Sequence, residues 1–487
     1  MLRDRILELL STQYERRILI FDFESICKSI DFVEWLKALD FEVNYYSDKL
    51  EFRILYENDL KHSQGKIATI VEKDIYVPYD IRRFFYQVEL RWSSIYPKLD
   101  SQCFLGTKYI SLELIYLAYE DYVGSKLSHD QTRVFIDGVY TNKRYVSLYT
   151  KILYDEINYI LKNEFLTHKD WFKIAKKYSE IIYYDDAYNN NYDFSEINEC
   201  FSSYIIAEYG KIPSVIDSEG PVINTKVIDY MLSDQRKIVF IVMDGMSIPD
   251  YYVIRKGLYD FELEEKLVFS MIPTTTTVSR QSLVTGKFPV EISNPFSLKD
   301  EKKMFVQSVL SYGYKENQIE YSNDINHEIG SNTQCLLLIL NNIDDMIHSQ
   351  TQGRSGLVSD IEIFNQSKAL HGLISKLLQQ GFAVYMSSDH GSTQAKGLGK
   401  LIKTGVEVET RSSRMLILKD IVQESEIVEK YKLTKYPGYF LDKNNNYYLC
   451  NYGESMDVKG SITLCHGGAS IEEVIVPFVR VKEKING

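Results

Sequence analysis

The stretch KIVFIVMDGMSIPD, residues 237–250, sets the expectation for the fold. An apolar run that reads as a buried strand ends abruptly in a carboxylate, Asp244. The pattern recurs in LLLILNNIDDMIH, residues 336–348, and in AVYMSSDHG, residues 383–391. Continuous apolar runs that alternate with turns and helical patterns are typical of a mostly parallel sheet with helices on both faces. The sequence therefore predicts an α/β fold for this part of the chain.

The three aspartates fall where such a fold presents chemistry. In open α/β sheets the functional site lies beyond the carboxyl ends of the strands. Asp244, Asp344 and Asp389 each come shortly after an apolar run. We therefore expect these three carboxylates to meet at one edge of the sheet.

The length of 487 residues predicts two or three domains. We expect a small α/β domain at 1–105, a helical domain or connector at 106–230, and a catalytic domain at 231–487. Within the last, segments near 290–335 and 395–460 separate the motifs, and we expect them to be lid or specificity insertions.

The N-terminal part reads as strand, helix and two further strands, beginning with RRILIFDFES at 16–25. This order resembles a receiver or flavodoxin-like half-fold. Asp22 and Glu24 lie at the first strand end, where such folds place acidic groups. Because no other receiver signature follows, the favoured interpretation is that they are ordinary polar residues at a strand end.

Composition narrows the class of protein. The net charge of -12 argues against a broad basic surface that wraps nucleic acid, but not against a small phosphate ester held by metal ions. Six scattered cysteines without a CxxC motif fit reduced thiols. No apolar run approaches the length of a membrane span, and the charged start lacks the apolar core of a signal peptide. We expect a cytoplasmic protein with no membrane contact.

Three aspartates and three histidines form a candidate metal constellation. The four-residue spacing of Asp344 and His348 places both on one face of a helix. Each element alone has a simpler explanation as a turn, a helix-face ion pair or a surface histidine. Together they suit two zinc-like ions, each with three protein ligands and open positions. The six candidates are Asp244, Asp344, His348, Asp389, His390 and His466.

A run of threonines opens the segment MIPTTTTVSRQSLVTGKFP, residues 271–289. We expect a helix to begin within the run. A hydroxyl at a helix N-terminus faces free N–H groups and is well placed for attack on a phosphate, although threonines there are also common helix caps. A bound metal would supply the activation that a hydroxyl lacks.

The ordered motifs VMDGMS, IPTTTTVSRQSLVTGKFP, IDDMIH, SSDHG and HGGASIEEVIVPF resemble the PglZ family of the alkaline phosphatase superfamily over roughly residues 235–480. That superfamily comprises bimetallic phosphate and sulfate ester hydrolases. The resemblance implies an alkaline phosphatase-like fold and two divalent ions, zinc or alternatively manganese.

The resemblance also implies a role for each residue. It assigns the nucleophile to Thr276, with its neighbours Thr275 and Thr277 as the nearest alternatives. Arg280, one helical turn later, is expected to contact the phosphate or to pair with an acidic neighbour. Asp345 is the alternative to Asp344, at the cost of the four-residue spacing. One ion is assigned to Asp244, Asp389 and His390, and the other to Asp344, His348 and His466.

PglZ relatives resemble phosphodiesterases and components of bacteriophage exclusion (BREX) systems. The resemblance therefore implies a nucleotide or oligonucleotide diester as substrate and other phage-defence proteins as partners. No sulfatase signature is present, which disfavours sulfate esters. Two alternatives remain: a non-catalytic scaffold of a defence complex, and a phosphomonoesterase.

Overall fold

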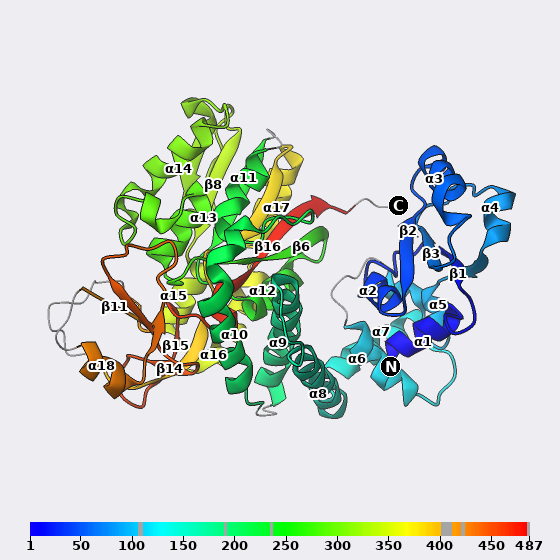
Figure 1. Cartoon of the computed structure of the whole chain (residues 1–487), viewed down its shortest axis with the longest axis horizontal. Helices are drawn as coiled ribbons and strands as arrows, with labels where there is room; N and C mark the ends of the chain where they lie inside the picture. Colours follow the sequence, from blue (N-terminus) through cyan, green and yellow to red (C-terminus); the bar gives the residue numbers. More distant parts are fainter. Residues whose placement is uncertain (106–110, 189–191, 234–236, 401–411, 420–423, 485–487) are drawn as a thin grey trace. The chain divides into compact units, whose positions relative to one another are not determined.

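The computed structural model describes residues 1–105, 111–188, 192–233, 237–400, 412–419 and 424–484. The chain divides into two compact units, Met1–Lys151 and Ile152–Gly487, both drawn in Figure 1. We call them the N-terminal and the C-terminal unit. No helix in the described ranges is long and apolar enough to cross a membrane.

The N-terminal unit is built on a four-stranded parallel sheet. The predicted strands and the first helix are present, but the strand order is β2-β3-β1-β4. A flavodoxin-like sheet instead begins 2-1-3. The receiver-like prediction is therefore wrong in strand order, because β3 lies between the first two strands. The strands are β1 (Arg17–Phe21), β2 (Phe41–Tyr45), β3 (Lys66–Val71) and β4 (Tyr86–Glu89).

Helices cover both faces of this sheet. Side chains that alternate along β1 and β3 fall into two separate apolar clusters, because successive residues of a strand point to opposite faces. One cluster includes residues of α1, α2, α5, α6 and α7, and the other includes residues of α3 and α4. The helices are α1 (Leu2–Leu9), α2 (Phe32–Lys37), α3 (Lys49–Leu55), α4 (Tyr79–Phe84), α5 (Trp92–Ile95), α6 (Leu112–Glu120) and α7 (His129–Tyr140).

The described part of region 106–230 contains several helices, which are shared between the two units. Because α6 and α7 contribute to the core of the N-terminal unit, the boundary by compactness falls after Lys151 and not at 105. The division into three domains stays a prediction. The later helices of this region are α8 (Lys143–Ile160), which contains the boundary, α9 (His168–Tyr188), α10 (Ser195–Glu208) and α11 (Val227–Leu232).

The C-terminal unit holds the predicted mostly parallel sheet, with strand order β6-β16-β9-β5-β8-β7. Strands β7, β8, β5 and β9 pair in parallel, and β16 runs antiparallel between β9 and β6. Every residue of β5 and β8 is buried, as expected for strands covered on both faces. The strands are β5 (Ile238–Met243), β6 (Phe261–Phe269), β7 (Ile319–Ser322), β8 (Cys335–Leu340), β9 (Ala383–Ser387) and β16 (Ile475–Glu483).

Apolar residues of α11, α13 and α14 pack on one face of this sheet, and α17 and α12 contact it on β9 and β16. Helix α9 lies against α12 (Figure 1). This layered arrangement confirms the predicted fold class. The helices are α12 (Ile248–Ile254), α13 (Gln281–Thr285), α14 (Glu301–Leu310), α15 (Asn342–Ser349), α16 (Gly353–Gln366), α17 (Ala369–Gln379), α18 (Glu424–Tyr431) and α19 (Ile471–Val474).

The two predicted insertions differ. Segment 290–335 supplies α14 and the edge strand β7, so part of it belongs to the core of the sheet. Segment 395–460 contains most of two small three-stranded sheets, and its residues 401–411 and 420–423 lie outside the described residues. The small sheets comprise β10 (Thr393–Gly397), β14 (Glu454–Ser455) and β15 (Ile462–Cys465), and β11 (Met415–Leu418), β12 (Thr434–Tyr436) and β13 (Asn446–Leu449).

Candidate metal centre

Two carboxylates follow the parallel neighbours β5 and β9. Asp244 comes directly after β5, and Asp389 comes two residues after the end of β9. The chain turns at Gly245 with a φ of +75°, a conformation that favours glycine. A Cβ at this position would come within 3.3 Å of Ile347 and 3.4 Å of the Asp344 carboxylate. Glycine here therefore permits both the turn and the close approach of α15.

The first group consists of Asp244, Asp389 and His390, all of them buried. One ligand atom from each lies within 4.8 Å of the other two. Nε2 of His390 is 3.7 Å from Oδ1 of Asp244 and 3.8 Å from Oδ2 of Asp389. Oδ1 of Asp389 accepts hydrogen bonds from the backbone N–H groups of Gly245, at 3.2 Å, and of His390, at 3.0 Å.

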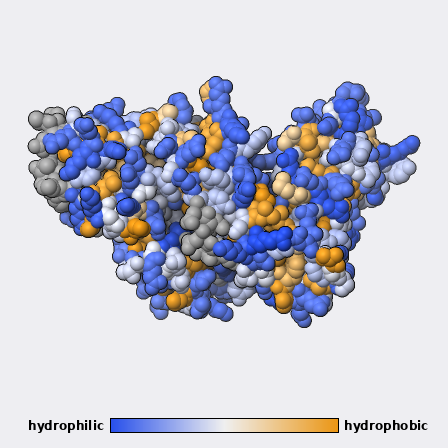
Figure 2. All heavy atoms as spheres, turned by 90° about the horizontal axis from the view of Figure 1, so that it is seen from below, coloured by the Kyte–Doolittle hydropathy of each residue, from blue (hydrophilic) through white to orange (hydrophobic). Residues whose placement is uncertain are grey.

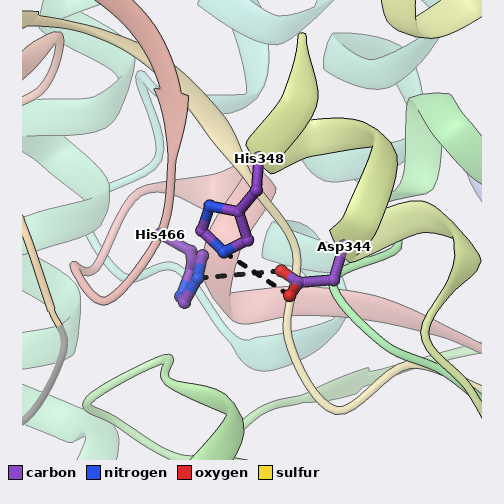
Figure 3. A group of neighbouring side chains, drawn as sticks. All are labelled: Asp344, His348 and His466. Carbon is purple, nitrogen blue, oxygen red and sulfur yellow. Dashed lines mark ion pairs between the residues drawn. The ribbon is translucent and has the colours of Figure 1, made fainter.

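The second group consists of Asp344, His348 and His466, again within 4.8 Å of one another. Asp344 and His348 share one face of α15, as their spacing predicts, and His466 directly follows β15. Both imidazole rings face the Asp344 carboxylate (Figure 3), with Nε2 distances of 3.4 Å from His348 and 3.9 Å from His466. The side chain of His348 is 62% exposed, so this group is open to solvent on one side. Asp345, the alternative ligand, is exposed and is not part of the group.

The two groups adjoin, because the rings of His390 and His466 stack with centroids 4.3 Å apart. Each ring is oriented by a backbone carbonyl. Nδ1 of His390 lies 3.1 Å from the carbonyl oxygen of Gly391, and Nδ1 of His466 lies 3.1 Å from that of Thr274. A proton on Nδ1 satisfies these contacts and leaves the Nε2 lone pair directed at the carboxylates. This is the usual arrangement of metal-ligating histidines.

Burial sets the charge state of both groups. Burial, reinforced by the charge of Asp244, raises the pKa of Asp389 well above its ordinary value and also raises the pKa of Asp344. Burial lowers the pKa of His390, and burial together with His390 lowers the pKa of His466 to about 4. Both histidines are therefore neutral at neutral pH, the form that binds metal. The crowded carboxylates are an electrostatic cost that a divalent cation would relieve.

The residues fit a metal on two further observations. Oδ2 of Asp389 and Oδ1 of Asp344 are buried, and neither has a hydrogen-bond partner among the described residues. Buried carboxylate oxygens are normally paired, so these two are available to a cation. A mixed set of imidazole nitrogens and carboxylate oxygens suits zinc and related transition metals.

Thr276 lies at the edge of the first group. It begins a π-helical turn, Thr276–Arg280, that leads into α13, so the helix begins within the threonine run as predicted. Its hydroxyl donates to Oδ1 of Asp244 at 3.3 Å and lies 3.1 Å from Nε2 of His390. The neighbouring hydroxyls of Thr275 and Thr277 lie 3.4 Å from each other. The structure thus places the hydroxyl of Thr276, and not that of Thr275, against the candidate ligands.

Arg280 pairs with acidic neighbours, which is one of the two roles predicted for it. It is buried between two carboxylates: Nη1 donates to Oδ2 of Asp244 and Nε donates to Oε2 of Glu301, both at 2.8 Å. Burial opposes the positive charge, yet the charges of Glu301 and Asp244 raise the pKa of the guanidinium. Contact of Arg280 with a substrate stays a prediction.

Sequence reasoning missed the residues that hold the His466 loop. The Thr274 hydroxyl donates to the carbonyl of Gly468 at 2.8 Å and accepts from the N–H of Gly467 at 3.1 Å. The buried carboxylate of Glu473 accepts from the N–H of Gly468 at 2.8 Å. Thr274 lies in the motif IPTTTT, and Gly467, Gly468 and Glu473 lie in HGGASIEE, so membership of these motifs was the available signal. Their pairing across the fold had none.

Glu301 was also missed, because it lies in a segment predicted as an insertion. It is 2% exposed, and its contact with Arg280 joins two positions 21 residues apart. A buried glutamate at the first residue of a helix has no distinctive sequence pattern. Asp22 and Glu24 were weighed as possible site residues. In the structure they bind backbone N–H groups, of Ile26 and Cys27 for Asp22 and of Trp92 for Glu24.

The sheet order, the strand-end carboxylates and the two adjoining groups match the alkaline phosphatase-like class of α/β proteins. The model of one family, described as the BREX system PglZ alkaline phosphatase-like domain, matches residues 222–481, more than half of the chain. The chain belongs to the PglZ family, which confirms the resemblance drawn from its motifs. A comparison with curated protein sequences finds no match.

Solved structures similar to this chain include murine ectonucleotide pyrophosphatase/phosphodiesterase 5, at 13% identity and a TM-score of 0.39, covering 50% of this chain and 88% of that one. The human counterpart has 14% identity, a TM-score of 0.37 and coverages of 51% and 88%. Phosphonoacetate hydrolase from Sinorhizobium meliloti 1021 has 12% identity, a TM-score of 0.35 and coverages of 50% and 90%. These likenesses are distant, and the family rests on the match over residues 222–481.

Proposed function

We propose that this protein is a metal-dependent phosphoric ester hydrolase that uses Thr276 as its nucleophile and prefers phosphodiesters of the nucleotide or oligonucleotide type. One observation carries the proposal. The Thr276 hydroxyl lies 3.3 Å from Asp244 and 3.1 Å from His390, two members of a buried group that has an unsatisfied carboxylate oxygen. A hydroxyl needs such a neighbourhood to become a nucleophile.

Asp244, Asp389 and His390 would hold one divalent cation, and Asp344, His348 and His466 a second. We favour zinc, with manganese as the alternative. When bound, the two cations would supply the positive charge that lowers the pKa of a hydroxyl and neutralises a transferring phosphoryl group.

The residues of the chain then divide the work. The Thr276 hydroxyl gives its proton to solvent, and Oγ1 attacks phosphorus while the ester bond to the leaving group breaks. The departing alkoxide takes a proton from solvent and leaves as the alcohol. Water then cleaves the phosphothreonine ester and restores the hydroxyl. The backbone contact of His390 Nδ1 with Gly391 fixes the ring that adjoins Oγ1. Exposed His348 leaves the side of the second group open, which suits entry of water and exit of the alcohol.

A diester is favoured because PglZ relatives resemble phosphodiesterases. A sulfate ester is disfavoured because the sequence contains no sulfatase signature. The BREX description of the family supports a role in anti-phage defence alongside other proteins of the system. The six scattered cysteines, which form no disulfide among the described residues, fit the reduced thiols of a cytoplasmic protein. The alternative is a scaffold with an idle metal site. The unpartnered oxygens of Asp344 and Asp389 favour metal binding under both readings, so turnover must decide between them.

The test measures metal content and turnover on one preparation. Elemental analysis counts zinc and manganese per chain, and hydrolysis of bis-p-nitrophenyl phosphate is compared with that of p-nitrophenyl phosphate, with and without chelator. We expect about two metal ions per chain and chelator-sensitive cleavage that is faster for the diester. Faster cleavage of the monoester would indicate a phosphomonoesterase. Bound metal without cleavage of either ester would favour the scaffold, and absence of metal would overturn the proposal.

A further inference from the structure

A series of buried and partly buried polar contacts runs from Asp244 to the edge strand β7. Asp244 presents its two oxygens to different partners: Oδ1 faces Thr276 and His390, and Oδ2 accepts from Arg280. Glu301 holds the other side of the guanidinium through Oε2, and Oε1 of Glu301 accepts from the hydroxyl of Tyr321. Of the four side chains that lead from Asp244 through Arg280 and Glu301 to Tyr321, the proposed function uses only Asp244 as a ligand.

Glu301 and Tyr321, the residues of this contact series that are farthest from Asp244, are held by the central sheet. Glu301 is the first residue of α14, whose Phe305 and Val309 lie in the core of the sheet. Tyr321 lies in β7 and pairs with Leu337 of the buried strand β8. The anchor therefore comes from segment 290–335, which sequence reasoning treated as an insertion.

The guanidinium is a fixed element in this arrangement. An arginine has a planar fork of donors, and two carboxylates on its Nε and Nη1 sides determine its orientation. If Glu301 loses its charge, the guanidinium retains one carboxylate, Asp244, and competes for it with any cation in the first group. While Glu301 is charged, Arg280 is shared between Glu301 and Asp244, and Oδ1 of Asp244 keeps its orientation toward Thr276.

We propose that Glu301 and Tyr321 are positioning residues for the first metal: they hold Arg280 on Oδ2 of Asp244, so that Oδ1 alone faces the cation and the nucleophile. This inference rests on the proposed metal-dependent function. Partners that orient a ligand in this way typically change metal affinity by about 10- to 100-fold when they are removed. Segment 290–335 then contributes to catalysis through Asp244, without touching the substrate.

The test isolates the first group. In the full-length chain, Asp344→Ala removes a ligand of the second group, and Co²⁺ titration followed by visible absorption reports binding at the group that remains. In this background we expect Glu301→Gln to weaken Co²⁺ binding about 10- to 100-fold and to change the absorption spectrum. Tyr321→Phe, which removes only a hydroxyl, should act in the same direction with a smaller effect. Glu316→Gln removes the same charge from an exposed position in the same segment and should change neither quantity.

A second titration makes the positioning role distinguishable from general loss of structure. With Asp389→Ala as the background, only the second group remains, and Glu301→Gln should leave its Co²⁺ affinity unchanged. Equal weakening at both groups would overturn the positioning role in favour of a global structural one. Unchanged binding and an unchanged spectrum for Glu301→Gln and Tyr321→Phe at the first group would also overturn it. Absence of Co²⁺ binding by the wild-type protein is a different result, and it would overturn the proposed function itself.

Discussion

Asp22 in the N-terminal unit and Asp389 in the C-terminal unit are both completely buried aspartates just beyond the end of a parallel strand. Their surroundings differ. Both oxygens of Asp22 accept a backbone N–H at 2.8 Å, from Ile26 and from Cys27. Asp389 uses Oδ1 in this way, but its Oδ2 has no hydrogen-bond partner among the described residues. A carboxylate at a strand end is thus structural when both of its oxygens accept hydrogen bonds from the backbone. It is a candidate metal ligand when one buried oxygen has no donor.

The charges around the two aspartates reinforce the difference. Asp389 lies beside a second carboxylate, Asp244, which together with burial raises its pKa. The fold therefore holds like charges together in the C-terminal unit, an arrangement that is typical of functional sites. The contact of Asp22 instead closes a local loop within its own unit.

The largest effect should come from the nucleophile. Thr276→Ala removes the hydroxyl that adjoins Asp244 and His390, and turnover of the better nitrophenyl ester should fall at least about 10³-fold. Metal content should stay near that of the wild type, because Thr276 is not a principal ligand. Thr277→Ala is the matched control, since its hydroxyl lies against Thr275, and it should keep most of the turnover. Equal turnover in wild type and Thr276→Ala would rule out the assignment.

The same substitution at the two aspartates should separate ligand from structural residue. Asp389→Asn keeps an acceptor for Gly245 and His390 but removes the charge that a cation requires. We expect this variant to lose about one metal ion per chain after dialysis, as measured by elemental analysis. Asp22→Asn should keep the full complement. If both variants retain two tightly bound ions, Asp389 is not a ligand and the contrast between the two sites fails.

Much of the candidate site could be predicted from the sequence because its residues lie in recognisable local patterns. Apolar runs that end in Asp244 and Asp389 predict strand ends, and the spacing of Asp344 and His348 predicts a shared helix face. The structure brings these residues and His466 into two adjoining groups. The assignment of Thr276 as nucleophile comes from the resemblance to the family motif. Its hydroxyl lies beside Asp244 and His390, which is compatible with that assignment, and its role as nucleophile stays a proposal.

The parts that could not be predicted depend on pairing between distant segments. No periodicity indicates that β3 lies between β1 and β2, or that a strand from segment 290–335 joins the edge of the central sheet. Glu301 is an ordinary glutamate until α14 carries it to Arg280. Strand order, and contacts such as that of Glu301 with Arg280, depend on how the faces of separate helices and strands pack against one another. The pattern of a single sequence describes each face by itself.

The smallest effect, and the sharpest form of the comparison, concerns local stability without metal. In Asp22→Asn one backbone N–H of Ile26 or Cys27 faces an amide donor, and an unsatisfied buried group costs about 1–3 kcal/mol. Amide hydrogen exchange in chelator-treated protein should therefore be about 5- to 150-fold faster at these two residues than in the wild type. Asp389→Asn removes one of two neighbouring like charges and keeps the acceptor, so the amides of Gly245 and His390 should exchange no faster. Faster exchange at both sites would mean that the Asp389 carboxylate supports the metal-free fold as Asp22 does, and the distinction between filled and unfilled lone pairs would then fail.

The sign of this difference carries the physical content. Local exchange is the appropriate observable because proteins with more than one compact unit commonly depart from a single cooperative unfolding transition, and this chain has two such units. A structural carboxylate stabilises the metal-free fold, so its neutralisation must loosen the loop that it closes. A ligand carboxylate next to another carboxylate destabilises the metal-free fold through repulsion. Binding of a cation offsets this repulsion. Faster exchange beside Asp22 but not beside Asp389, after the same Asp→Asn change, would therefore identify Asp389 as the carboxylate that is held for a metal.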